Sequence, residues 1–313
     1  MGMVLQFGLL VIGFVLLIKG ADWFVEGASK IADRFGIPQI VIGLTIVAMG
    51  TSLPEAAVSI SAAFKGSADI TIGNVVGSNI LNVLLILGLT SAIRAIPVKK
   101  KTICIEMPFT IAVTALLVAV GLFFGELNRI WGVVLCALMV VYLLYLLWIS
   151  KTDKDAVEEG ATAGKNESML KMIAMIIVGA GMIILGSDFS VDAATAIAMG
   201  FGMSERLVGL TIVAFGTSLP ELVTSCTAAI KGKADIAVGN IVGSNLFNIL
   251  FVVGITALIT PVPYNAAFFV DSIVAIGAMV LLWVCVLPKK CLNRVGGILM
   301  LLGYAGYFIY LIQ

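Results

Sequence analysis

A segment of 40 residues occurs twice in this chain, and the two copies begin 166 residues apart. Residues 43–82 and 209–248 align without a gap, and 27 of the 40 aligned positions are identical. Each copy contains the sequence G-T-S-L-P-E followed by G-N-x-V-G-S-N-x-x-N. A repeat of this kind predicts that the chain folds as two similar halves.

The composition is typical of a membrane protein. Hydrophobic residues make up 61% of the chain and charged residues only 12%, with a mean hydropathy of +1.15, whereas roughly a quarter of the residues in soluble domains are charged. A formal net charge of +1 indicates no nucleic-acid partner. The chain contains no histidine, no C-x-x-C pair among its five cysteines and no phosphate-binding G-x-x-x-x-G-K-[ST] loop. We therefore expect no cofactor, no zinc or haem site and no ATP-driven pump.

Ten apolar segments are long enough to cross a lipid bilayer, which needs about 20 residues per helix. The first segment lacks a basic leader and a cleavage site, so it is predicted to be a retained span. The only extended polar stretch, residues 150–168, divides the chain into halves of five helices each, 1–149 and 169–313. The predicted spans are residues 3–30, 38–64, 70–93, 103–124, 129–149, 169–197, 206–230, 236–259, 265–287 and 294–312.

The number of helices in each half predicts how the halves are related. Because five is odd, the second half enters the membrane in the opposite sense, so the five-helix repeats are inverted, as in many secondary transporters. With both termini outside, 15 of the 19 Lys and Arg residues fall in inside loops and three in outside loops, and Lys19 lies within the first span. This bias follows the positive-inside rule. We predict an all-α, multi-pass plasma-membrane protein with the 150–168 linker in the cytoplasm.

The proline in each motif predicts a helix that is broken near the middle of the membrane. Pro54 has no N–H to donate to the Gly50 carbonyl, and it disfavours helical angles at Leu53, so we expect a break within residues 48–53. Pro220 has the same effect in the second copy. Non-helical backbone at membrane depth is tolerated only where it is buried in protein or lines a cavity. The freed carbonyls are hard oxygen ligands that suit Na⁺ and Ca²⁺.

Polar side chains recur at helical spacing beside each proline, at i, i+3 and i+7 in one helix and at i, i+4 and i+8 in the next. If the two copies face each other, these oxygens form a cage around a cation. Such residues can also serve only in helix packing, but a glutamate at the bilayer centre costs a few kcal/mol, and it occurs in both copies. The pattern comprises Ser52, Glu55, Ser59, Asn74, Ser78 and Asn82 in the first copy and Ser218, Glu221, Ser225, Asn240, Ser244 and Asn248 in the second.

The two glutamates set the charge of this cage. Glu55 and Glu221 together carry −2 when both are ionised, which one Ca²⁺ or two Na⁺ would neutralise. A loaded site can therefore cross the membrane, whereas an empty charged site crosses poorly, which is the physical basis of obligatory exchange. Glu106 and Asp271 lie near the ends of predicted spans, where pairing or snorkelling explains them.

These residues closely resemble the sodium/calcium exchanger family of the cation/calcium antiporter superfamily, in particular its compact prokaryotic members. The G-T-S-x-P-E and G-S-N-x-x-N cores carry the resemblance, which extends over nearly the whole chain. It implies a secondary antiporter, not an enzyme, that exchanges Na⁺ for Ca²⁺ by alternating access and extrudes Ca²⁺. The first and sixth helices would slide across a fixed core. The internal repeat makes one central site, so a monomer should suffice.

The resemblance also implies the ligands of each ion. Ca²⁺ would be bound by the side chains of Glu55 and Glu221 and the carbonyls of Thr51 and Thr217. An outer Na⁺ site would use Ala214, Thr217, Ser218, Ser78 and Glu55. An inner Na⁺ site would use Ala48, Thr51, Ser52, Ser244 and Glu221. Asn82 and Asn248 would complete the central arrangement.

Two departures from relatives bear on the coupling ion. Asn248 stands where some prokaryotic members and the potassium-dependent branch carry Asp, which argues against K⁺ cotransport. Proton-coupled relatives carry Glu in a G-N-x-x-E pattern where this chain has Gly77 and Gly243, which disfavours H⁺ coupling.

One alternative is a Ca²⁺/H⁺ exchanger, in which the two glutamates would carry protons. Another is a Ca²⁺-permeable channel, which usually needs symmetric subunits around a pore. An intramembrane hydrolase would lack a nucleophile and a metal-binding histidine.

Overall fold

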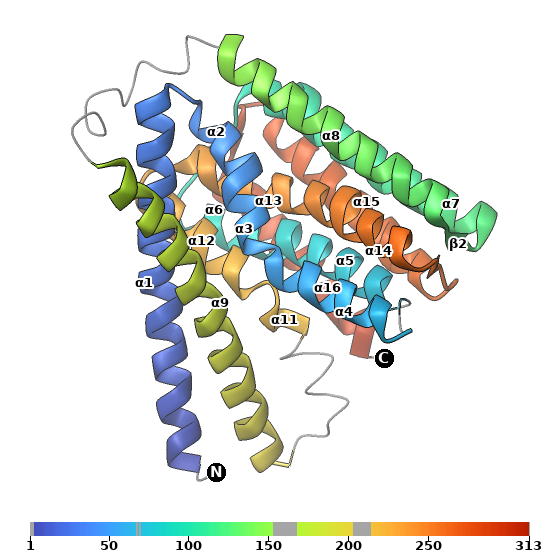
Figure 1. The fold of residues 1–313 in the computed structure, drawn as a ribbon, viewed down its shortest axis with the longest axis horizontal. Coiled ribbons are helices and arrows are strands. Elements are labelled where there is room, and N and C mark those ends of the chain that lie inside the picture. Colours follow the sequence, from blue (N-terminus) through green and yellow to red (C-terminus); the bar gives the residue numbers. More distant parts are fainter. Residues whose placement is uncertain (1–2, 67, 69, 153–167, 203–213, 313) are drawn as a thin grey trace.

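The computed structural model describes residues 3–66, 68, 70–152, 168–202 and 214–312 (Figure 1). Nearly all of these residues are helical, and four segments, labelled η, have π-helical hydrogen bonding. The elements in chain order are α1 (Met3–Phe35), α2 (Gln39–Ile42), η1 (Gly43–Val47), α3 (Ala48–Thr51), α4 (Leu53–Phe64), α5 (Ile70–Ile80), η2 (Leu81–Leu87), α6 (Gly88–Ile93), β1 (Ile96–Pro97), η3 (Thr102–Glu106), α7 (Met107–Phe124), β2 (Glu126–Leu127), α8 (Arg129–Thr152), α9 (Met169–Gly200), α11 (Ala214–Gly216), α12 (Leu219–Ile230), α13 (Ala234–Phe247), η6 (Asn248–Val253), α14 (Gly254–Ile259), β3 (Val262–Pro263), α15 (Phe268–Val286), β4 (Cys291–Leu292) and α16 (Arg294–Ile312).

Among the described residues, eight helices are long and apolar enough to cross a membrane, or up to nine if the bent pair Gln39–Thr51 and Leu53–Phe64 counts as one span. These helices match nine of the predicted spans. The predicted span 206–230 begins outside the described ranges, and its described part consists of α11 and α12. The predicted linker 150–168 also lies mostly outside them. The total of ten spans therefore stays a prediction.

The outer helices expose large apolar side chains. Val4 on α1 is 87% exposed, Leu170 on α9 is 76% exposed and Ile130 on α8 is 71% exposed. Apolar surface of this extent is unfavourable in water but is what a lipid bilayer contacts. The exposed faces therefore confirm that the chain is a multi-pass membrane protein.

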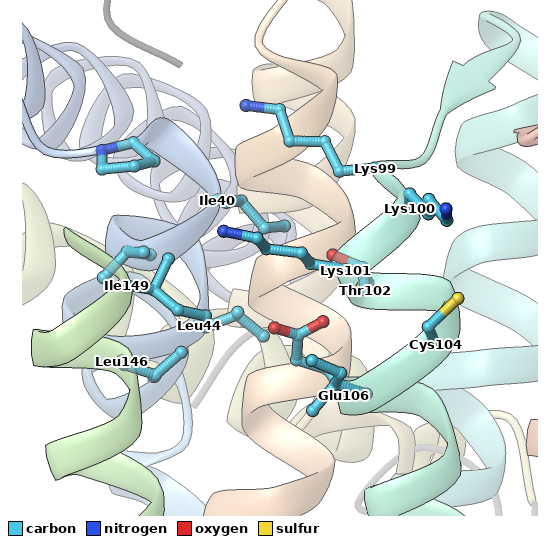
Figure 2. A pocket seen from close by; sticks show the side chains of 13 residues that line it. Ile40, Leu44, Lys99, Lys100, Lys101, Thr102, Cys104, Glu106, Leu146 and Ile149 are labelled. Atoms are coloured by element: carbon cyan, nitrogen blue, oxygen red, sulfur yellow. The ribbon is translucent and has the colours of Figure 1, made fainter. Parts of the chain in front are cut away.

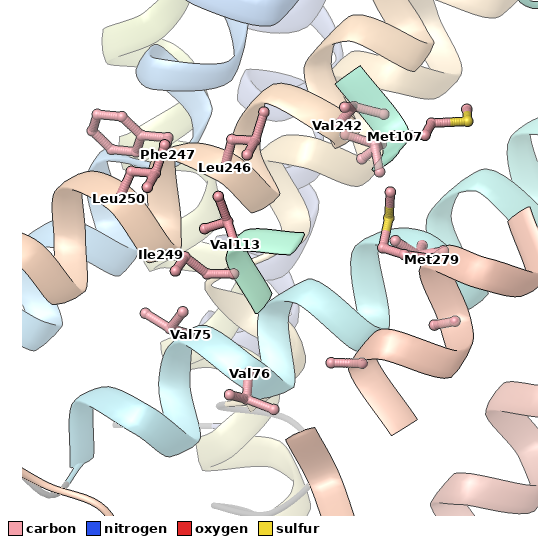
Figure 3. Close-up of a cluster of buried hydrophobic side chains, with 14 of the residues drawn as sticks. Val75, Val76, Met107, Val113, Val242, Leu246, Phe247, Ile249, Leu250 and Met279 are labelled. Carbon is pink, nitrogen blue, oxygen red and sulfur yellow. The ribbon is translucent and has the colours of Figure 1, made fainter. Parts of the chain in front are cut away.

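Two continuous helices form the centre of the structure. Within an apolar stretch of 18 residues in the span Ile70–Ile93 (α5, η2 and α6) 72% of the residues are buried, and within one in Ala234–Ile259 (α13, η6 and α14) 83% are, compared with 17% within one in α1. The apolar core lies around these helices. Figure 3 shows Val75 and Val76 of α5 together with Val113 of α7 and with side chains of α13, η6 and α15.

The repeated proline breaks its helix in the predicted region. Ser52 separates α3 from α4 with φ −86° and ψ 10°, and the helix axis bends there by 47°. Thr217 and Ser218 separate α11 from α12, and Ser218 has a similar conformation with φ −92° and ψ 4°. The prediction for Leu53 is wrong, because this residue begins α4. A proline in the first helical turn needs no hydrogen-bond donor, so the break falls on the residue before Leu53.

Glycines bring the central helix α13 into contact with η1. A Cβ atom at Gly239 would lie 2.8 Å from the carbonyl oxygen of Ile40, and one at Gly243 would lie 2.7 Å from that of Leu44. Both distances are below normal van der Waals contact, so only glycine fits. These two motif glycines therefore allow a close helix approach, whereas a Cβ atom at Gly77, the equivalent of Gly243 in the first copy, would meet nothing within 4 Å.

Two short ladders join the first half to the second. Strand β1 pairs with β4 and strand β2 pairs with β3, both antiparallel. Each strand is only two residues long, so the chain is all-α as expected. These strands follow or precede helix ends, where the extended backbone of a connection finds hydrogen bonds in the opposite half. In each ladder, the earlier strand of one half pairs with the later strand of the other.

Helices α1 and α9 pack closely along each other (Figure 1). A Cβ atom at Gly20 would lie 2.8 Å from the Gly179 carbonyl oxygen, and one at Gly186 would lie 2.7 Å from that of Gly13. Backbone therefore faces backbone at two levels of this pair. Small residues of this kind allow the van der Waals contact that holds helices together in lipid.

Gly186→Ala should destabilise the purified protein, because the added methyl group meets the backbone of α1. We expect a loss of about 1–3 kcal/mol, measured as a lower Tm in detergent. Gly181→Ala on the same helix is the matched control, since a Cβ at Gly181 meets no described atom within 4 Å, and it should leave Tm unchanged or slightly raised. Equal Tm values for the two variants would contradict the α1–α9 contact.

Candidate cation-binding site

The two motif glutamates lie at equivalent places in the two halves. Glu55 is in the first turn of α4 and Glu221 is in the first turn of α12. Both side chains are 0% exposed. The start of a helix carries a partial positive charge, which favours an ionised carboxylate there. The break that starts each helix therefore also places its glutamate next to the partial positive charge of a helix N-terminus.

Each glutamate is contacted by a serine from the opposite half. Ser52 Oγ donates to Glu221 Oε1 at 2.7 Å, and Ser218 Oγ donates to Glu55 Oε1 at 3.4 Å. The sequence S-x-x-E at a helix start commonly forms a local capping box. Here neither serine caps its own helix, because its hydroxyl is used across the site.

A second serine reaches each glutamate from its own half. Ser78 Oγ donates to Glu55 Oε1 and Ser244 Oγ donates to Glu221 Oε1, both at 3.4 Å. Ser244 Oγ also lies 3.3 Å from the carbonyl oxygen of Ala48. The structure thus brings together the side chains predicted for each Na⁺ site around one carboxylate oxygen.

The threonines of the two motifs are placed differently. Thr51 is buried, and its hydroxyl lies within 3.3 Å of the Ala48 carbonyl and 3.0 Å of Asn240 Oδ1. Thr217 is half-buried and follows α11, which begins at Ala214. Thr217 directly precedes Ser218, and Ala214 lies four residues before it.

Four buried oxygens of the predicted ligand set have no hydrogen-bond partner among the described residues. They are Glu55 Oε2, Glu221 Oε2, Asn82 Oδ1 and Asn248 Oδ1. An unsatisfied buried acceptor costs roughly 1–3 kcal/mol, and a charged one costs more. Two acidic and two amide oxygens left without donors are suited to a cation.

The chemistry of the donors narrows the kind of cation. No group of three or more His, Cys, Asp or Glu side chains occurs in the described part of the chain. The oxygens gathered around the two glutamates belong to carboxylate, hydroxyl, amide and carbonyl groups, which are the ligand types that hard ions such as Na⁺ and Ca²⁺ prefer.

Two further asparagines contact the site, and the sequence interpretation missed them. Asn79 and Asn245 lie 166 residues apart, like the other equivalent positions of the two copies, and both are buried. Asn82 Nδ2 donates to Asn245 Oδ1 and Asn248 Nδ2 donates to Asn79 Oδ1, each at 3.1 Å. The presence of asparagine at this position in both copies of the repeat was the signal that could have identified them.

One contact to the site region occurs in only one half. Ser187 of α9 donates from Oγ to the carbonyl oxygen of Gly216 at 2.9 Å, directly before Thr217. The residue 166 positions earlier is Ala21, which is fully buried and has no hydroxyl. The two halves are therefore similar but not equivalent in this conformation.

Other acidic residues in the spans lie outside this cluster, as predicted. Glu106 Oε1 accepts from the Tyr145 hydroxyl at 3.1 Å, and Asp271 Oδ1 accepts from the Tyr307 hydroxyl at 3.0 Å. Glu106 also lines a cavity of about 490 Å³ near Lys101, shown in Figure 2. None of the residues that line this cavity belongs to the predicted ligand set.

Comparison with known proteins agrees with this arrangement. The sequence profile of a family described as sodium/calcium exchanger protein matches residues 5–148 and 171–313. The inner membrane protein YrbG of Escherichia coli strain K12 is 39% identical over 90% of both chains, and the sodium/calcium exchanger MaX1 of Methanosarcina acetivorans is 30% identical over 98% of both chains. A solved structure of the sodium-calcium exchanger NCX_Mj, soaked with zero Na⁺ and Ca²⁺, matches at a TM-score of 0.85 and 32% identity, covering 99% of this chain and 100% of that one.

The profile covers both halves, and the full-length similarity to a sodium/calcium exchanger extends through the linker region. The helical fold and the two buried motif glutamates agree with that similarity. The chain therefore belongs to the sodium/calcium exchanger family of membrane antiporters.

Proposed function

We propose that the chain exchanges Na⁺ for Ca²⁺ at one central site that both halves build. The observation that carries this proposal is the pair of fully buried glutamates, each with one oxygen that lacks a hydrogen-bond donor in the described structure. A buried negative charge needs a positive partner. The transported cation supplies it.

Ca²⁺ would be bound by the carboxylates of Glu55 and Glu221 with the carbonyls of Thr51 and Thr217. Na⁺ would occupy two sites that flank the Ca²⁺ position, one around Glu55 and one around Glu221. The serines that contact each glutamate would complete its site. Ala48 and Ala214 would add backbone carbonyls, and Asn82 and Asn248 would face the space between.

The charge of the site explains why exchange is obligatory. Two ionised glutamates need a charge of +2, which one Ca²⁺ or two Na⁺ provide. Moving an uncompensated charge through the bilayer is strongly unfavourable. The loaded site therefore changes its access side readily and the empty site does not. An inward Na⁺ gradient would then drive Ca²⁺ out of the cell.

Ten spans arranged as two inverted repeats account best for the contacts between the halves. Each of the two ladders joins an early strand of one half to a late strand of the other, and the serine–glutamate contacts are reciprocal. The excess of Lys and Arg in loops on one side favours both termini outside and the 150–168 linker in the cytoplasm of a plasma-membrane protein.

Alternating access would be provided by α1 and α9 sliding over the remaining helices. They pack on each other through glycines, and only 17% and 22% of their apolar windows are buried. A pair that is mostly surrounded by lipid can move with little loss of protein packing. Since both copies of the motif meet within one chain, a monomer contains the complete site.

Purified protein in liposomes loaded with Na⁺ should take up ⁴⁵Ca²⁺ when the outside is free of Na⁺, with pH and membrane potential clamped by ionophores. Uptake should saturate with Ca²⁺ and stop when the Na⁺ gradient is removed. Uptake that follows a pH gradient and ignores Na⁺ would establish Ca²⁺/H⁺ exchange instead. Flux that needs no counter-ion would indicate a channel.

Glu55→Gln and Glu221→Gln should each reduce Na⁺-driven Ca²⁺ uptake by roughly 100-fold or more, because each removes one of two charges that face a divalent ion and every 1.4 kcal/mol or so is tenfold. Glu106→Gln is the matched control, since this glutamate is also buried but lies outside the cluster, and it should stay close to the wild type. Robust uptake by Glu221→Gln would exclude the proposed site.

A further inference from the structure

We propose that Asn79 and Asn245 are positioning residues that orient the amides of Asn82 and Asn248 so that their oxygens face the cations. This inference rests on the proposed function, since it concerns the same site. It assigns a role to two buried side chains that are not themselves in the ligand set.

The orientation of Asn245 is set by a group that can only accept. Its Nδ2 donates to the backbone carbonyl oxygen of Asn79 at 3.2 Å, and Asn79 Nδ2 donates to the carbonyl oxygen of Asn245 at the same distance. A backbone carbonyl has no donor, so the amide nitrogen must point to it. The Oδ1 of each of these asparagines must therefore point the other way.

The orientation of the ligand asparagines follows from the first pair. Because Asn245 presents Oδ1, the atom of Asn82 that lies 3.1 Å from it must be the nitrogen, which places Asn82 Oδ1 on the opposite end of the amide. The same argument applies from Asn79 to Asn248. Each chain of two hydrogen bonds, called a relay below, thus begins at the backbone carbonyl of Asn79 or Asn245 and ends at the side-chain oxygen of Asn82 or Asn248.

The ends of the two relays are the oxygens of Asn82 and Asn248 that lack a partner among the described residues. An amide that could turn would present its NH₂ group to the cation in part of the molecules, and two N–H donors repel a cation. Fixing the amide prevents this. Asn79 and Asn245 use both ends of their own amides in these hydrogen bonds, so we assign them a positioning role.

The test is a double-mutant cycle between Asn245→Ala and Asn82→Asp. A carboxylate has an acceptor oxygen at each end, so it needs no orientation, and the Oδ1 of Asn245 would repel it. Asn245→Ala alone should weaken the apparent Na⁺ affinity by roughly fivefold. In the Asn82→Asp background the same change should cost nothing or should strengthen Na⁺ binding.

Na⁺ affinity would be measured as the Na⁺ concentration that gives half of the rise in Tm of the purified protein in detergent, at constant ionic strength with choline as the replacement ion. The KM for Na⁺ in proteoliposome exchange should change in parallel. Thr114→Val is the control for loss of a buried hydrogen-bonding side chain away from the site, since the Thr114 hydroxyl donates to the Thr110 carbonyl on α7, and it should leave Na⁺ affinity unchanged.

An equal loss of Na⁺ affinity in both backgrounds would overturn the inference, because it would mean that Asn245 only holds α5 and α13 together. Absence of any Na⁺-dependent rise in the wild-type Tm would overturn it as well. If wild type binds Na⁺ but shows no Na⁺-driven Ca²⁺ uptake, the proposed function fails and the cycle still decides the role of Asn245. If Asn245→Ala does not fold, Asn79→Ala with Asn248→Asp provides the equivalent cycle.

Discussion

The structure depends on two carboxylates that are buried at membrane depth without a cationic side chain. In the described residues, the ion pairs involve other acids: Lys231 with Asp22 at 2.6 Å and Lys99 with Asp235 at 2.9 Å. The side-chain hydrogen bonds that Glu55 and Glu221 accept from serines come from neutral hydroxyl groups. Permanent salt bridges would stabilise the fold but would leave no charge for cargo. Hydroxyl donors solvate part of each carboxylate and leave the remaining oxygen for a cation.

Much of the irregular backbone of the described residues lies at this site, although the π-helical segment η3 lies outside it. The helix breaks include Ser52 and Ser218, and π-helical segments begin at Leu81, beside Asn82, and at Asn248. A π-helical turn shifts the side chains that follow it around the helix axis and frequently marks a functional site. The central helices are buried deeply enough that protein, and not lipid, surrounds these irregular turns.

The two halves repeat the same contacts with unequal geometry. Ser52 lies 2.7 Å from Glu221, whereas Ser218 lies 3.4 Å from Glu55, and only α9 holds the backbone of its motif through Ser187. If the two halves exchange these geometries, access to the site changes from one side to the other. That exchange is what the proposed alternating access requires of a duplicated chain. It needs two conformations of similar energy, which two halves with a repeated motif can provide.

The sequence by itself determined the membrane class, nine of the expected spans, the helix break and the family, because hydrophobic length, proline chemistry and the repeated motif are local properties. It also indicated Glu55 and Glu221 as the charged centre. Only the tertiary structure decided which atoms meet. The S-x-x-E sequence favours a local cap, yet Ser52 bonds the glutamate 169 residues away, and Asn79 became visible as a partner only through Asn248, also 169 residues away. Hydrogen-bond partners across such separations depend on how the halves pack, and a one-dimensional pattern does not contain that geometry.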